Sequence, residues 1–131
     1  SYTEVTDEAM ELLANFELNE DALRRIDELP YGQQRLVEIV IALGQRPSVL
    51  LLDEPAAGIP SSESQHILDA ASALASDITV LIIEHDMEIV FSVADYITVL
   101  VSGAVLIEGE PEVIAADERV RAVYLGEVDR G

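Results

Sequence analysis

The sequence predicts an α/β fold with a mostly parallel sheet. A continuous apolar run at residues 49–52 and a mostly apolar run at residues 79–83 are typical of buried parallel strands. Helical apolar spacing precedes the first run and recurs between the two. Strand and helix patterns therefore alternate, as expected when helices cover a parallel sheet.

The helix positions follow from apolar periodicity and end signals. A first helix is expected to run to about Asn15 with Thr6 or Asp7 as its cap, and Ser61 or Ser62 is expected to cap a later one. Ser102-Gly103 predicts a tight turn between strands at 96–101 and 104–108. The remaining expectations are a short helix or turn within 17–28 and helices over 33–44, 61–75, 87–94, from Pro111, and over 118–125.

Composition places the chain among globular proteins. It has 131 residues, half of them apolar, and no cysteine, which fits one domain at most in a reducing compartment such as the cytoplasm. The acidic start does not resemble a signal peptide. The longest apolar stretch, residues 96–107, is too short to cross a bilayer.

The charge balance is strongly acidic. There are 26 Asp and Glu residues against 7 basic ones, a net charge of −19, which disfavours nucleic acid and anionic membranes as partners. Solubility, a basic remainder of the protein, or a salt-adapted organism could each explain this charge. All 7 basic residues are arginine, so the chain has no lysine for a phosphate-binding loop of the form G-x-x-x-x-G-K-[ST].

Three features could carry chemistry. Asp53 and Glu54 end an apolar strand, where α/β sheets bind ligands, although a solvated acidic turn has the same pattern. Gly32 precedes a helix whose N–H groups could bind an anion, although an ordinary turn is the simpler interpretation. His85 follows the second strand and could donate to a phosphate oxygen, whereas such a histidine is more often satisfied by a neighbouring group. His66 is interpreted as a surface residue.

The order of these features resembles the ABC ATPase family. LPYGQQRLVEIVIAL is similar to the family's signature helix, VLLLDEP to its Walker B motif, and EHDM to its switch-histidine segment. With DEPAAGI, the hairpin region and the terminal RAVYLGE, the resemblance runs from about Leu29 to Glu127 and is most similar to the ATP-binding subunits of branched-chain amino acid importers. It implies the C-terminal part of a P-loop NTPase (RecA-like) domain, with residues 1–45 as helical-subdomain piece and signature helix and 46–131 as the remainder.

The resemblance also implies roles for individual residues. Asp53 would bind Mg²⁺, Glu54 would act on the hydrolytic water, and His85 would contact the γ-phosphate of ATP. Two segments would face ATP and the partner subunit in a head-to-tail dimer. The first comprises Leu29, Pro30, Tyr31, Gly32 and Gln33, and the second comprises Ala57, Gly58, Ile59 and Pro60.

Two prolines depart from the family pattern. Pro30 stands where the family usually has serine, which removes a hydroxyl and an N–H donor. Pro60 stands where the interface loop usually has Asp or Asn. Two functions therefore remain: a C-terminal fragment of an importer ATPase, or a degenerate, non-catalytic module for dimerisation or docking.

The phosphate-loop strand is expected to be absent. In the family fold it lies between the strand before His85 and the strand at 96–101, so its absence leaves a gap with two unpaired edges. The isolated chain is expected to pair those strands directly or to fill the gap from another molecule, and self-association is one outcome. The partners implied by the resemblance are a second ATP-binding subunit and membrane permease subunits, which would place the protein at the inner face of the plasma membrane. The isolated chain is expected to lack ATPase activity.

Overall fold

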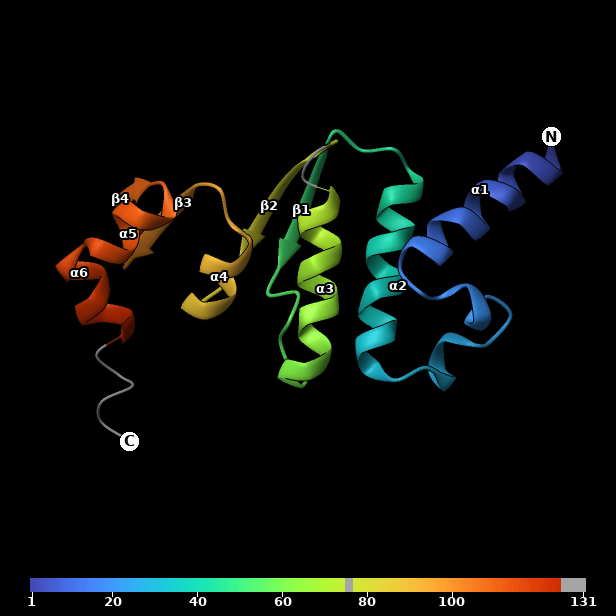
Figure 1. Ribbon diagram of the computed structural model, residues 1–131, viewed down its shortest axis with the longest axis horizontal. Coiled ribbons are helices and arrows are strands. Elements are labelled where there is room, and N and C mark those ends of the chain that lie inside the picture. The colour runs from blue at the N-terminus through green and yellow to red at the C-terminus, as the bar shows by residue number, and fades with distance from the viewer. Residues whose placement is uncertain (75–76, 126–131) are drawn as a thin grey trace. The chain divides into compact units, whose positions relative to one another are not determined.

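The chain forms two compact units in the computed structural model, Ser1–Ile83 and Glu84–Gly131 (Figure 1). The structure describes residues 1–74 and 77–125. Ala75, the expected end of one helix, and Gly126-Glu127 of the terminal segment lie outside the described residues. The predicted division between residues 45 and 46 separates the helical-subdomain piece and signature helix from the remainder of the domain. It stays a prediction.

The first unit contains three helices and two strands in its described part. These are α1 (Tyr2–Asn15), α2 (Tyr31–Gly44), β1 (Val49–Asp53), α3 (Ser61–Leu74) and β2 (Thr79–Ile83). Two short 3₁₀ turns, Asn19–Asp21 and Ile26–Glu28, connect α1 to α2 and confirm the expected short helix or turn there.

Two helix starts, and the cap of a third helix, differ from the prediction. Ser1 rather than Thr6 or Asp7 caps α1, and it forms a reciprocal capping box with Glu4. Helix α2 begins at Tyr31, two residues earlier than expected, with Pro30 at its cap position. Ser61 is the first residue of α3 rather than its cap.

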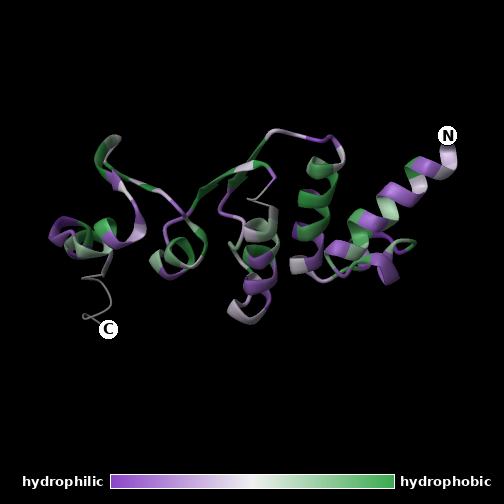
Figure 2. Ribbon diagram, turned by 45° about the horizontal axis from the view of Figure 1, so that its top comes forward, coloured by the Kyte–Doolittle hydropathy of each residue, from purple (hydrophilic) through white to green (hydrophobic). Residues whose placement is uncertain are grey.

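The core of the first unit lies between α1, α2, α3 and one face of the β1–β2 sheet. The two strands pair in parallel, with Leu50 opposite Val80 and Asp53 opposite Ile83. Helices α2 and α3 lie side by side in Figure 1, and Figure 2 shows the C-terminal turns of α2 as mostly hydrophobic. The buried core residues are Phe16, Leu18, Leu36, Ile39, Val40, Leu43, Leu50 and Ile67.

The second face of this sheet is exposed, contrary to the expectation of two buried strands. Val49 and Leu51 of β1 are 51% and 69% exposed, and Leu81 and Ile83 of β2 are 55% and 57% exposed. Residues of a strand alternate between faces, so these four form the apolar face opposite the core. The apolar run was correctly interpreted as a strand, but its sequence could not show whether both faces are covered.

We expect this apolar face to drive self-association. Replacing both Leu51 and Leu81 by lysine should convert concentration-dependent oligomers into monomers, because exposed apolar patches promote association. Sedimentation velocity at increasing protein concentration measures the change. The matched control replaces Leu100 and Val105 by lysine as well. These two residues are 59% and 56% exposed on the hairpin of the second unit. Equal effects of the two pairs, or a wild-type chain that stays monomeric, would contradict the prediction.

The second unit contains a hairpin and short helices. They are α4 (Met87–Val93), β3 (Ile97–Val101), β4 (Ala104–Gly109), α5 (Pro111–Ala116), α6 (Glu118–Val120) and a π turn (Arg121–Leu125). The predicted hairpin is confirmed, since Ser102 and Gly103 both have positive φ, 50° and 80°, as a type I′ turn requires. Its core comprises Ile97, Val99, Ile114 and Val120.

The described strands form two separate two-stranded sheets. β1 pairs with β2, and β3 pairs antiparallel with β4. The expected pairing across the gap would join the two units, and both this pairing and filling of the gap by another molecule stay predictions. Within the described ranges, no helix combines the length and apolarity needed to cross a membrane.

Candidate functional site

The acid pair lies where β1 ends. Asp53 is the last residue of β1 and pairs with Ile83. Glu54 follows in a left-handed conformation with φ of 45°, and its N–H donates to the Ile83 carbonyl at 2.8 Å. Its own carbonyl accepts from the Ala57 N–H at 3.0 Å. Both acidic residues are exposed at the carboxyl ends of parallel strands, the usual ligand-binding edge of such sheets.

The turn before α2 leaves the start of this helix without a side-chain cap. Pro30 makes no capping hydrogen bond, because its side chain has no acceptor. Leu29 is 7% exposed, and its carbonyl accepts from Gln34 Nε2 at 2.9 Å. The first N–H groups of any helix lack intrahelical partners, and here they belong to Tyr31, Gly32 and Gln33. The sequence therefore places three potential anion donors after Pro30.

The structure brings the two predicted ATP-facing segments together. A Cβ atom added to buried Gly32 would lie 3.6 Å from Ile59 Cγ2 and only 2.7 Å from Glu63 Oε2. A Cβ atom on Gly58, whose φ is 72°, would meet the Tyr31 ring at 3.7 Å. The turn before α2 and the segment from Ala57 to Pro60 thus form one contiguous surface within the first unit.

Glu63 is a component of this surface that sequence reasoning missed. It lies in the first turn of α3, and its carboxylate approaches Gly32 at the start of α2. A carboxylate is favoured near the positive end of a helix dipole, so this position suits the charge of Glu63. No local pattern marks Glu63, because the contact joins residues that are far apart in sequence.

His85 belongs to the second unit. It is exposed, lies two residues beyond β2, and directly precedes Asp86, which caps α4 by accepting from the N–H groups of Glu88 and Ile89. Its role toward a phosphate stays a prediction. His66 is exposed on α3, which confirms its interpretation as a surface residue.

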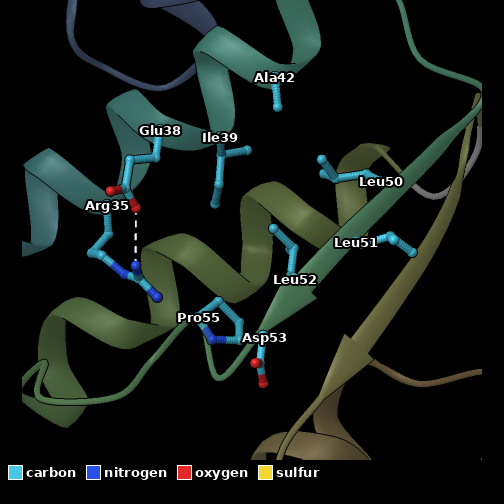
Figure 3. Close-up of a pocket in the computed structure, with 9 residues that line it drawn as sticks. All are labelled: Arg35, Glu38, Ile39, Ala42, Leu50, Leu51, Leu52, Asp53 and Pro55. Carbon is cyan, nitrogen blue, oxygen red and sulfur yellow. Dashed lines mark hydrogen bonds and ion pairs between the residues drawn. The ribbon is translucent and has the colours of Figure 1, made fainter.

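A pocket of about 210 Å³ is lined by residues of α2 and β1 and includes Asp53. Figure 3 shows Ile39 of α2 and Leu52 of β1 projecting into this space, with Asp53 at its lower end. Arg35 contributes the positive charge, and its Nη1 is paired with Glu38 Oε2 at 2.9 Å. The cavity wall is therefore apolar along β1 and charged toward the end of the strand.

The carboxylate of Asp53 fits a magnesium ion that is bound mainly by water molecules and by the phosphates of a nucleotide. No group of three or more His, Cys, Asp or Glu side chains that could hold a metal occurs in the part of the chain that the structure describes. Mg²⁺ usually keeps several waters and takes only one or two carboxylates together with substrate phosphates. A single exposed carboxylate at Asp53 meets that requirement, provided that a nucleotide supplies the phosphates.

Replacement of Pro30 should reveal the missing cap. We expect Pro30→Ser to be more stable than Pro30→Ala by about 1 kcal/mol, because only serine can accept from the first turn of α2. Both variants lose the effect of proline on the unfolded chain, about 0.4–1 kcal/mol, so Pro30→Ser should lie close to the wild type. Urea unfolding followed by circular dichroism tests this order. Equal midpoints for the serine and alanine variants would show that position 30 does not cap α2.

Comparison with known proteins finds similarity to ABC transporter proteins. Residues 2–57 match the family model described as ABC transporter. The chain is 44% identical over 126 residues to the high-affinity branched-chain amino acid transport ATP-binding protein BraF of Pseudomonas aeruginosa. The matched region covers 92% of this chain and 49% of BraF. It is 38% identical over 127 residues to LivG of Escherichia coli, which has the same descriptive name, with 95% of this chain and 50% of that protein covered.

Solved structures show the same relationship. The ADP conformation of an ATP-binding cassette of an ABC transporter matches with a TM-score of 0.82 and 34% identity, over 94% of this chain and 50% of the other. CbiO1 from Clostridium perfringens, part of an ABC transporter complex, matches with a TM-score of 0.82 and 30% identity, over 95% of this chain and 51% of CbiO1. The predicted fold class is thereby confirmed. The chain spans about half the length of the curated relatives it matches.

Proposed function

We propose that this chain, which is similar to ABC transporter ATP-binding proteins, is the C-terminal part of an importer's ATP-binding subunit. The complete protein would hydrolyse ATP with Mg²⁺ to drive uptake of branched-chain amino acids or similar polar solutes. The observation that carries this proposal is the exposed acid pair at the end of β1, in the same unit as the joined surface of Gly32 and Ile59.

Each site residue has a chemical task in this proposal. Asp53 would hold the hydration shell of Mg²⁺, which supplies positive charge to the phosphates when it is bound. Glu54 would accept a proton from the attacking water. His85 would donate to the γ-phosphate. The N–H groups of Gly32 and Gln33 would face ATP held by a second subunit, because a helix N-terminus stabilises negative charge.

The surface from Ala57 to Pro60 would cross the interface between the two ATP-binding subunits. Its contact with the start of α2 supports this arrangement, since one surface could then meet both the nucleotide and the partner. Permease subunits would complete the transporter at the inner face of the plasma membrane. Nucleic acid is not a proposed partner, given the net charge of −19.

A non-catalytic dimerisation or docking module is the second candidate. The uncapped start of α2 at Pro30 favours it, because the residue that would cap the helix and donate a hydroxyl is absent. Pro60 favours it in the same way at the proposed subunit interface.

A chimera distinguishes the two candidates. The chain would be joined to the part of BraF from Pseudomonas aeruginosa that it does not match, which we expect to supply the phosphate-binding loop. The first candidate predicts MgATP hydrolysis by the chimera and none by the isolated chain. A folded chimera that binds MgATP without hydrolysing it, and gains no activity from Pro30→Ser, would favour the non-catalytic module.

A further inference from the structure

Glu54 lies in a turn whose left-handed backbone conformation must be stabilised by neighbouring contacts. A left-handed φ of 45° is uncommon for residues other than glycine and costs free energy unless neighbouring contacts fix it. The backbone of β2 provides one contact, through the Ile83 carbonyl. The Ala57 N–H provides a second, within the turn. Both are main-chain contacts made by the turn and its neighbouring strand.

A side chain from a different element provides a third contact. Arg35 Nη2 donates to the Glu54 carbonyl at 3.4 Å, across 19 residues of sequence. Arg35 lies on α2, three residues beyond Gly32, and its side chain is 27% exposed. Its Nη1 is held by Glu38 at 2.9 Å, so the two ends of one planar guanidinium group contact an acid on α2 and the acid-bearing turn.

We propose that Arg35 is a positioning residue for Glu54, which fixes the acid-bearing turn relative to α2. The proposal rests on the proposed role of Glu54 in hydrolysis. A distance of 3.4 Å is long beside the roughly 2.7–2.9 Å of most charged hydrogen bonds. A shift of α2 toward the turn by a few tenths of an ångström therefore strengthens the contact. Any group that binds at the start of α2 could then alter the placement of Glu54.

The chemistry of the side chain makes the proposal specific to arginine. A guanidinium group has donors in a fixed planar fork and can serve Glu38 and the Glu54 carbonyl together. Lysine keeps the charge but concentrates its donors on one atom, so it can favour only one of the two partners. Arg35→Lys should therefore lose part of the positioning while leaving the charge of the cavity unchanged.

Amide hydrogen exchange on the 131-residue chain tests the positioning directly. In Arg35→Gln, the protection of the Glu54 and Ala57 amides should fall about tenfold, and less in Arg35→Lys, because a hydrogen bond from a charged donor is lost. The amide of Leu68 in α3 should keep its protection. Arg25→Gln is the matched control, since Arg25 pairs with nearby Asp27. Unchanged protection at Glu54 and Ala57, or an equal loss at Leu68, would overturn the proposal.

Kinetics of the chimera separate this proposal from the proposed function. Arg35→Lys should lower kcat for ATP about tenfold with an unchanged KM, as expected when an acid is misplaced but ATP binding is kept. An unchanged kcat in Arg35→Lys would overturn the positioning, even if Glu54→Gln abolishes turnover. If Glu54→Gln leaves turnover intact, the proposed role of Glu54 as the proton acceptor fails, whereas the exchange result at Ala57 still decides whether Arg35 holds the turn.

Discussion

Replacement of Glu54 by glutamine is expected to lower the ATP turnover of the chimera by about 10²–10⁴-fold. Glutamine has nearly the shape of glutamate and can keep the backbone contacts to Ile83 and Ala57. It cannot accept the proton of the attacking water, so the loss should appear in kcat. Binding of MgATP should remain, because Asp53 and the phosphate-binding loop are unchanged.

Glu112→Gln provides the control for this prediction. Glu112 is an exposed residue of α5, and its replacement changes the net charge by the same amount. Steady-state phosphate release for both variants gives the comparison. If Glu54→Gln stays within about threefold of the unmodified chimera, the carboxylate of Glu54 is not the general base.

The second large effect is expected in the core of the first unit. Ile67 is 1% exposed on α3 and belongs to the cluster that joins α2 to β1. Ile67→Ala should destabilise the chain by about 2–5 kcal/mol, because it removes buried methyl groups and leaves a cavity. That is a large fraction of the roughly 5–15 kcal/mol that stabilises a typical domain.

Ile41→Ala is the matched control for the core prediction. Ile41 is also an isoleucine in a helix, but it is 63% exposed on α2. Urea unfolding should show a large loss for Ile67→Ala and a change within about 0.5 kcal/mol for Ile41→Ala. Similar losses for the two variants would show that α3 does not pack against the sheet as described.

Local features of the fold could be predicted because local chemistry determines them. The turn at Ser102-Gly103 needs two residues with positive φ, and the short side chain of serine followed by glycine provides them. The strands predicted at residues 49–52 and 79–83 are confirmed, because short apolar runs are typical of strands. The predicted start of α1 is wrong because several residues near it are good caps. The reciprocal capping box between Ser1 and Glu4 sets the start of this helix.

Burial and long-range contacts could not be predicted in the same way. The apolar residues of β1 and β2 are compatible with burial on both faces, yet Leu51 and Leu81 are exposed. What covers a face depends on other polypeptide and not on the strand itself. For the same reason, sequence reasoning found Asp53, Glu54 and Gly32 from their positions beside regular elements but missed Glu63 and the contact of Arg35 with Glu54.

This chain carries the acid pair and the start of α2 but has no lysine for a phosphate-binding loop. Titration calorimetry of MgATP into the isolated chain tests the consequence for nucleotide binding most directly. Because the chain has no lysine and therefore no phosphate-binding loop, we expect a Kd of about 1 mM or weaker. The chimera should bind MgATP at micromolar concentrations. Micromolar affinity in the isolated chain would show instead that its residues form a complete nucleotide site.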